Sequence, residues 1–99
     1  MHLDTDKLAE QAAEAAKLMK LLANERRLLV LCKLAGAGEM TVGALARAVG
    51  LSQSALSQHL SLMRAEGLVS FRRQGQTLHY AIANPMAERL LSTLREIYC

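Results

Sequence analysis

The chain has 99 residues, which is enough for one small domain spanning residues 1–99 and leaves no room for a second. Apolar residues make up 52% of the sequence but aromatic residues only 3%, so we expect an aliphatic core like that of a compact helical protein. The formal net charge of +3 favours a polyanionic partner without requiring one.

The first seven residues are polar and acidic, and no apolar stretch follows them, so no secretory signal is expected. The longest uninterrupted apolar run, Leu28 to Cys32, is too short to cross a bilayer. We therefore expect a soluble cytoplasmic protein with no membrane partner. Two cysteines in a reducing compartment do not by default form a structural disulfide.

Helical spacing of apolar residues predicts two helices in the first third of the chain. The first runs from about Asp6 to Leu22. Its apolar stripe consists of Leu8, Ala12, Ala15, Met19 and Leu22, widened by Leu18 and Leu21. The second begins at Asn24, a good N-cap, and is expected to end near Ala35, where the run Gly36-Ala37-Gly38 breaks the pattern.

The stretch from Thr41 to Arg64 predicts a helix-turn-helix. Thr41 caps a short helix that Gly50 ends, and Ser52 caps another that continues to about Glu66. Leu56 and Leu60 are expected to hold this second helix in the core. Its exposed side then presents hydroxyl and amide groups, which suit contacts to base edges. The predicted DNA contacts here are Thr41, Gln53, Ser54, Ser57 and Gln58.

Alternating apolar residues on both sides of Gly75 predict a β-hairpin, with strands at 68–73 and 76–82. Its tip carries Arg72, Arg73 and Gln76, which we expect to contact phosphates or the minor groove. Asn84 and Pro85 open a last helix, whose apolar edge consists of Met86, Leu90, Leu94 and Ile97. The fold class is therefore mostly α with a β-hairpin wing, a winged helix-turn-helix.

The first and last helices have broader apolar stripes than so small a core can cover. We interpret them as the interface of a two-fold symmetric homodimer. Such a dimer would bind an inverted-repeat operator in double-stranded DNA, with half-sites about one helical turn, roughly 34 Å, or a multiple apart.

This order of elements resembles the ArsR/SmtB-type winged-helix repressors over nearly the whole chain. Three strings are more specific than the order: residues 23–28 (ANERRL) resemble the opening of the family's second helix, residues 51–60 (LSQSALSQHL) its recognition helix, and residues 64–69 (RAEGLV) the segment before its wing. The resemblance implies a transcriptional repressor that releases its operator when it senses an inducer.

Most members of that family sense metals, but the ligand sets of its metal sites are missing here. One type needs a pair of cysteines near the second helix, where this chain has Cys32 alone. The other needs Asp and His on the last helix, and residues 86–99 contain neither. His2, His59 and His79 lack metal-ligand spacing, so we expect no metal site and no cofactor.

The surroundings of Cys32 and Cys99 resemble the thiol-sensing branch of the family, the BigR, SqrR and HlyU type. In that branch a cysteine of the second helix and one of the last helix form a dithiol switch, and reactive sulfur species or oxidants link them. The resemblance implies that Cys32 and Cys99 are this pair. A direct disulfide needs Cα atoms within about 7 Å, whereas a polysulfide bridge tolerates more.

Other interpretations remain open at this point. Cys32 alone resembles a small buried hydrophobic residue, and both cysteines could be structural in a regulator that senses a metal, another ligand or nothing. Arg26 and Arg27 suit salt bridges better than phosphate contacts. A protein-interaction module would leave the polar helix face and the arginine wing without a purpose. No nucleophile with its base, glycine-rich phosphate loop or C-x-x-C motif supports an enzyme.

Overall fold

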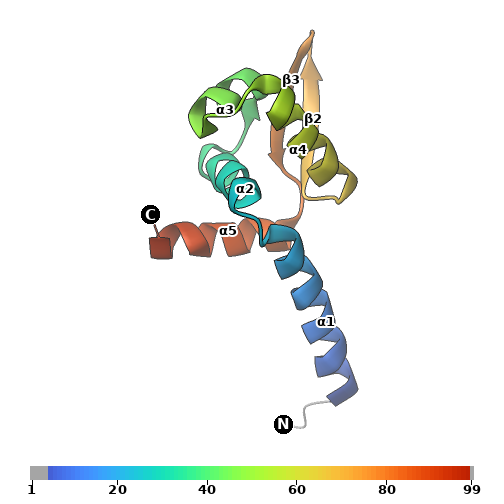
Figure 1. Cartoon of the computed structure of the whole chain (residues 1–99). Coiled ribbons are helices and arrows are strands. Elements are labelled where there is room, and N and C mark those ends of the chain that lie inside the picture. Colours follow the sequence, from blue (N-terminus) through green and yellow to red (C-terminus); the bar gives the residue numbers. More distant parts are fainter. Residues whose placement is uncertain (1–4, 99) are drawn as a thin grey trace.

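The computed structural model describes residues 5–98, and over that range it contains five helices and one three-stranded antiparallel sheet. In chain order the elements are α1 (Thr5–Leu22), α2 (Glu25–Ala37), β1 (Met40–Thr41), α3 (Val42–Val49), α4 (Gln53–Ala65), β2 (Val69–Gln74), β3 (Thr77–Ile82) and α5 (Pro85–Tyr98). The fold is the predicted winged helix-turn-helix: α3 and α4 form the helical pair, and β2 and β3 form the wing beside them (Figure 1).

Polar caps set the helix boundaries where the sequence placed them. The side chains of Asn24 and Ser52 accept hydrogen bonds from backbone amides three residues later, at 3.0 and 3.1 Å. Gly50 ends α3 in the left-handed conformation, with φ of 71°, which a residue without Cβ adopts at no cost. The predicted end of α2 was two residues short. Gly36 and Ala37 are helical, and the helix ends at Gly38, whose amide donates to the Leu34 carbonyl.

The wing is joined to the helix-turn-helix by a third strand that the sequence did not predict. In the hairpin Val69 lies opposite Ile82 and Phe71 opposite Tyr80, with the turn at Gly75. The short strand β1 pairs with the other edge of β3, so the strand order is β1-β3-β2. Because β1 leads directly into α3, the wing and the helical pair are hydrogen-bonded to one another through β3.

The core is aliphatic, as the composition predicted. Helices α2, α3, α4 and α5 and strand β2 all contribute to it. Its fully buried large side chains are Val30, Leu31, Leu34, Leu45, Leu56, Leu60, Met63, Leu68, Val69 and Leu91. On α5 the residues that face this core are Ala87 and Leu91, whereas Met86, Leu90 and Ile97 of the predicted apolar edge are exposed.

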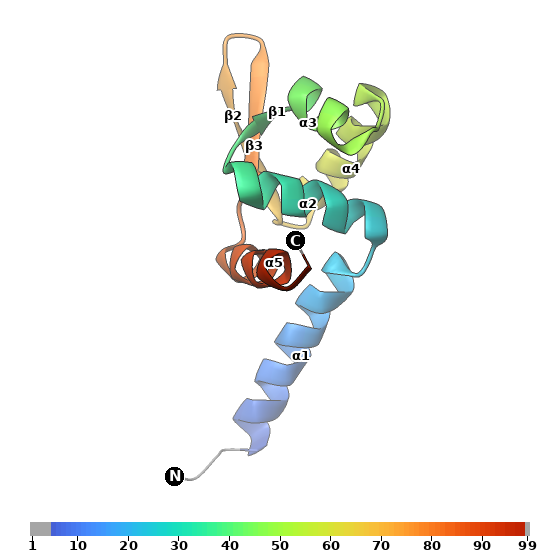
Figure 2. The ribbon, with the colours of Figure 1, turned by 90° about the vertical axis from the view of Figure 1, so that its left-hand side faces the viewer.

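Helix α1 projects away from the rest of the molecule, as both ribbon views show (Figures 1 and 2). Leu22, at its C-terminal end, is the only residue of α1 that is buried. The Cα radius of gyration is therefore 15.2 Å, against about 13 Å for a compact chain of this length. Over the described part of the chain, no helix has the combination of length and apolarity that a membrane span requires.

Candidate functional site

The outward face of α4 consists of hydroxyl and amide side chains. Gln53, Ser54, Ser57 and Gln58 are all exposed, while Leu56 and Leu60 on the opposite face are fully buried. The predicted division of this helix into a polar and a buried face is confirmed. Ser61 continues the polar face and lines a shallow hollow with Ser57, Gln58 and Leu62. His59, by contrast, is half-buried.

Arg47 lies close to the first turn of α4, and the sequence analysis did not single it out. A Cβ atom added at Gly43 would be 3.6 Å from both the Arg47 guanidinium and the Gln53 amide nitrogen, so these two groups flank the same glycine. Arg47 is the only charged residue of α3, and it is exposed. That single charge in an otherwise apolar helix was the feature that could have identified it.

Thr41 has a structural role at the position where the sequence predicted a DNA contact. Its Oγ1 accepts a hydrogen bond from the Ala44 amide at 3.2 Å and caps α3, and the residue is half-buried. The hydroxyl hydrogen stays available as a donor. A phosphate contact from Thr41 is compatible with this cap.

The two arginines of the wing have different surroundings. Successive side chains of a strand point to opposite faces of the sheet, so the Arg72 and Arg73 side chains lie on opposite faces of the wing. Arg72 donates to Glu39 through Nε at 3.0 Å and through Nη2 at 2.7 Å. This hydrogen bonding lowers the pKa of Glu39 and raises that of Arg72. Within residues 5–98, Arg73 forms no ion pair, and Gln76 is exposed at the tip.

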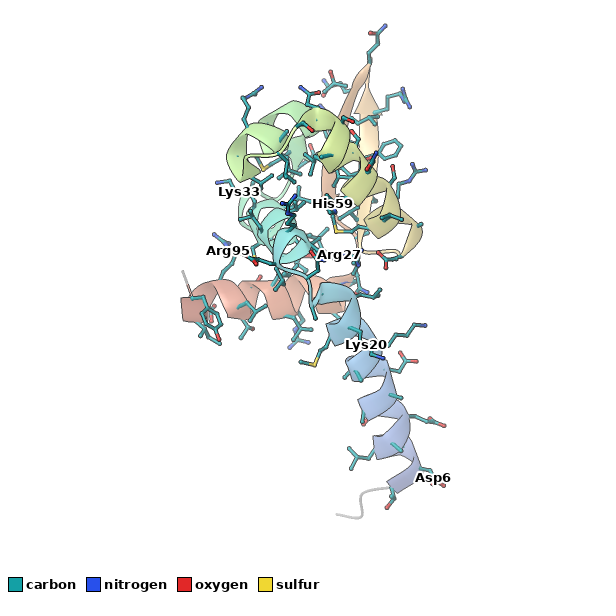
Figure 3. The ribbon with its side chains drawn as sticks, viewed as in Figure 1. Asp6, Lys20, Arg27, Lys33, His59 and Arg95 are labelled. Carbon is teal, nitrogen blue, oxygen red and sulfur yellow. The ribbon has the colours of Figure 1, made fainter. Side chains whose placement is uncertain are left out.

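Arg27 joins three elements where α1, α2 and α4 meet (Figure 3). Its guanidinium donates to the Leu21 carbonyl at 2.8 Å and pairs with Glu66, the C-cap of α4, at 2.9 Å. The sequence predicted a salt bridge for this arginine, with Glu25 as one candidate partner, and the structure gives Glu66. In the last turn of α4, the Arg64 guanidinium carbon lies 4.4 Å from the centroid of the Phe71 ring.

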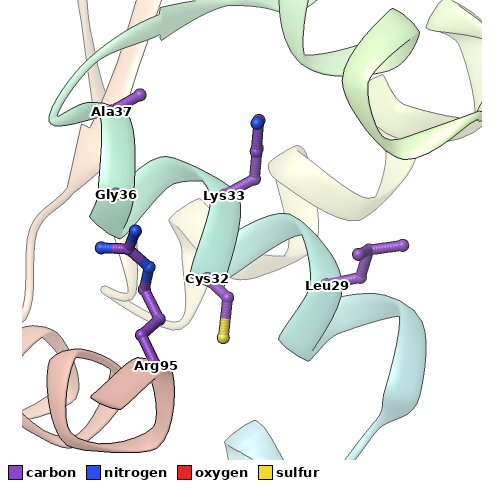
Figure 4. A pocket seen from close by; sticks show the side chains of 6 residues that line it. All are labelled: Leu29, Cys32, Lys33, Gly36, Ala37 and Arg95. Atoms are coloured by element: carbon purple, nitrogen blue, oxygen red, sulfur yellow. The ribbon is translucent and has the colours of Figure 1, made fainter. Parts of the chain in front are cut away.

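Cys32 is half-buried on α2 and lines an open hollow between α2 and α5 (Figure 4). The hollow is lined by Leu29, Cys32, Lys33, Gly36, Ala37 and Arg95. The predicted partner, Cys99, lies outside the described residues and directly follows Tyr98, the last residue of α5. Among the residues that the structure describes, no three His, Cys, Asp or Glu side chains gather in a way that could hold a metal ion.

Comparison with known proteins identifies the family. Residues 24–70 match the family described as bacterial regulatory protein, arsR family. The HTH-type transcriptional regulator YgaV of Escherichia coli is 42% identical over 93% of this chain and 93% of its own length. The crystal structure of the transcriptional regulator HlyU from Vibrio vulnificus superposes with a TM-score of 0.92 at 39% identity, covering 98% of this chain and all of that one.

A further solved structure, the transcriptional repressor BigR from Xylella fastidiosa, has a TM-score of 0.87 at 33% identity, covering 97% of this chain and 94% of that one. HlyU and BigR belong to the thiol-sensing branch of the family, the branch that the sequence resembles. These relatives are DNA-binding transcriptional regulators and not enzymes. The chain belongs to the ArsR family of bacterial regulatory proteins.

Proposed function

We propose that this protein is a homodimeric repressor that binds an inverted-repeat operator and releases it when Cys32 and Cys99 are linked. The observation that carries the DNA-binding part is the exposed polar face of α4, opposite a fully buried Leu56 and Leu60. Helix α4 enters the major groove, where hydroxyl and amide groups can read base edges. A regulator with this target acts in the cytoplasm, where the bacterial chromosome lies.

Cationic side chains flank this face and supply contacts that do not depend on sequence. Arg47 lies beside Gln53 at the start of α4, and Arg73 extends from the wing without a carboxylate partner among the described residues. Both suit phosphate oxygens, which fix the position of the helix in the groove. Arg72 is a weaker candidate because Glu39 already occupies its guanidinium.

The dimer forms through α1 and α5, whose exposed apolar side chains line one groove. Leu18, Met19, Met86 and Leu90 are the large apolar members of that groove. A second copy covering it would remove apolar surface from water on both chains and place the two α4 helices about a two-fold axis. The half-sites of the operator are then separated by about one helical turn, roughly 34 Å, or a multiple.

The switch is a dithiol that an inorganic polysulfide oxidises. A thiolate of one cysteine attacks a sulfur atom of the polysulfide, an S–S bond breaks, and hydrosulfide leaves with the electron pair. The second thiolate then attacks the sulfur now attached to the first cysteine and displaces another hydrosulfide. With a three-sulfur polysulfide the products are a bridge of three sulfur atoms, counting the two cysteine Sγ atoms, and two hydrosulfide ions, so the thiols are oxidised and the polysulfide is reduced. An oxidant such as peroxide would give the direct disulfide.

The bridge acts on DNA affinity through α2. Cys32 lies on this helix, and so does Arg27, whose ion pair with Glu66 joins α2 to the end of α4. Tying the end of α5 to α2 therefore constrains the proposed dimer helix and the recognition helix together. Such a link weakens binding only if it fits the free arrangement of the two α4 helices better than the bound one.

The test is to treat the reduced protein with inorganic polysulfide, determine its mass by mass spectrometry, and measure its affinity for the operator. The Cys32→Ser and Cys99→Ser variants are treated and measured in the same way. We expect the parent protein to gain an intramolecular bridge and lose affinity, and each variant to retain its affinity after treatment. If the variants lose affinity as the parent does, the dithiol switch is wrong. If selection from random DNA recovers no inverted repeat that the reduced protein binds more tightly than unrelated DNA, the repressor assignment is wrong as well.

A further inference from the structure

A guanidinium group lies over the same face of α2 that carries Cys32. In Figure 4 the Cys32 sulfur points from α2 towards α5, while the Arg95 side chain rises from α5 and ends at Gly36. Both side chains line one open hollow. The proposed dithiol switch assigns no role to this cation.

Gly36 is what lets Arg95 come so close. A Cβ atom at this position would be 2.7 Å from the Arg95 guanidinium carbon, too near for any side chain to be present without moving it. Glycine in a helix interior is less stable than alanine, so Gly36 does not stabilise α2 locally. Cys32 precedes Gly36 by four residues, which places the two positions on one face about 5–6 Å apart. The guanidinium is therefore held about one helical turn from the thiol.

Arg95 lacks a carboxylate partner among the described residues, as Arg73 does. Arg27 pairs with Glu66 and Arg72 with Glu39, but Arg95 forms no ion pair with any residue from 5 to 98. The one other charged residue that lines the hollow is Lys33, and its ammonium group points away from α5 in Figure 4. The described lining thus offers a fixed positive charge beside Cys32 and no carboxylate to neutralise it.

We infer that Arg95 is a specificity residue of the switch: it attracts a small anionic sulfur donor, a hydropolysulfide or persulfide, into the hollow beside Cys32. This inference rests on the proposed function, since it assumes that Cys32 is the thiol that reacts. An anion gains Coulomb attraction from Arg95 as it approaches the sulfur, whereas neutral hydrogen peroxide gains none. The hollow would therefore favour reactive sulfur species over peroxide.

The experiment compares two alkylating agents of nearly equal size, anionic iodoacetate and neutral iodoacetamide. Both react with the same thiolate, so any change in the fraction of ionised Cys32 cancels in the ratio of their rate constants. The measurement uses the full chain carrying Cys99→Ser, which leaves Cys32 as its single thiol because the sequence has two cysteines. The variants compared are Arg95→Gln, Arg95→Lys, Gly36→Ala and, as a control, Arg26→Gln, which removes an exposed arginine elsewhere on α2.

In Arg95→Gln we expect the iodoacetate-to-iodoacetamide ratio to fall about threefold at low ionic strength, the effect of one unit charge some 6 Å away in a water-like dielectric. The fall should shrink as salt is added. Gly36→Ala should lower the ratio in the same direction, because the new methyl group displaces the guanidinium. Arg95→Lys should restore much of it, and Arg26→Gln should leave it unchanged.

An unchanged ratio in both Arg95→Gln and Gly36→Ala would overturn the inference, and circular dichroism of each variant excludes misfolding as the cause of a change. A second readout uses the protein with both cysteines. Arg95→Gln should need about threefold more polysulfide to release the operator and an unchanged dose of peroxide; equal shifts for both reagents would also overturn it. Failure of the switch itself would be recognised separately, because the alkylation ratio does not depend on operator release.

Discussion

Arg72 and Arg73 are neighbours in the wing, yet they should contribute differently to DNA binding. Arg73 has no carboxylate partner among the described residues, whereas a bidentate contact from Glu39 holds Arg72. Each lysine or arginine that neutralises a phosphate contributes close to one unit to the salt dependence of log K. We expect Arg73→Gln to reduce that slope by about 1 and Arg72→Gln to reduce it by much less.

The measurement is operator binding by fluorescence anisotropy at several salt concentrations. Glu39→Gln serves as the complementary variant, since it releases Arg72 and should raise affinity for unrelated DNA. Equal losses of slope in the two arginine variants would show that Arg72 exchanges Glu39 for phosphate at no cost.

The acidity of Glu39 reports on the same contact without DNA. Hydrogen bonding from Arg72 is the main cause that lowers its pKa, with smaller electrostatic contributions from Arg72 and His79. Because the folded-state pKa is depressed, the contact is intact above the ordinary pKa of glutamate and is lost as the pH falls through the lowered value. In an NMR titration of the side-chain carboxyl carbons, the pKa of Glu39 should lie below the ordinary value of a glutamate. Arg72→Gln should move its pKa upwards, and no upward movement would contradict the assignment.

At the scale of a single element, variants of Thr41 can distinguish its role as the cap of α3 from a contact with DNA. Its Oγ1 caps α3, so Thr41→Ala should lower the free energy of unfolding by about 1 kcal/mol. Thr41→Ser keeps the hydroxyl and should lose much less. Chemical denaturation of both variants checks this. Operator affinity of the folded alanine variant then tests the DNA contact, since a residue that serves only as a cap would leave that affinity unchanged.

How far the sequence predicts each element depends on whether local chemistry determines it. Ser52, Gly50 and Asn24 act within one turn of the chain, so the helix boundaries that they set were correct. Strand β1 exists because Met40 and Thr41 meet β3 nearly forty residues later, and two residues carry no alternating pattern. The end of α2 was misplaced because Gly36 was taken as the helix breaker, whereas Gly38 is the glycine whose positive φ ends the helix.

The candidate site shows the same division between local and tertiary information. The polar face of α4 follows from helical periodicity and was predicted residue by residue. The pairing of Arg72 with Glu39 was missed, because the partners are 33 positions apart and meet only when β1 joins the sheet. Arg95 was missed for the same reason. Charged residues that meet across elements are therefore the part of this site that needed the structure.

At the scale of the whole molecule, the exposed apolar surface of α1 and α5 indicates that the chain associates with a second copy. Met19 is 62% exposed and Leu90 41% exposed, and both line the groove between the two helices. Only the C-terminal end of α1 is buried against its own chain. An 18-residue helix with so little tertiary packing would be marginal alone in water, so its stability should depend on association.

We therefore expect Met19→Lys and Leu90→Lys to convert a dimer into a monomer, because each places a charge in an apolar interface. Ala13→Lys is the matched control: it adds the same charge to α1 about 120° around the helix from Met19. Analytical ultracentrifugation should give a dimer for the parent and for Ala13→Lys, and a monomer for the two groove variants. The melting temperature should rise with protein concentration in the dimers only. A monomer carries only one recognition helix. Its operator binding should therefore be weaker by about 100-fold or more, since binding of the second half-site is no longer intramolecular. A parent protein that sediments as a monomer at every concentration would contradict both the interface and the two-fold operator derived from it.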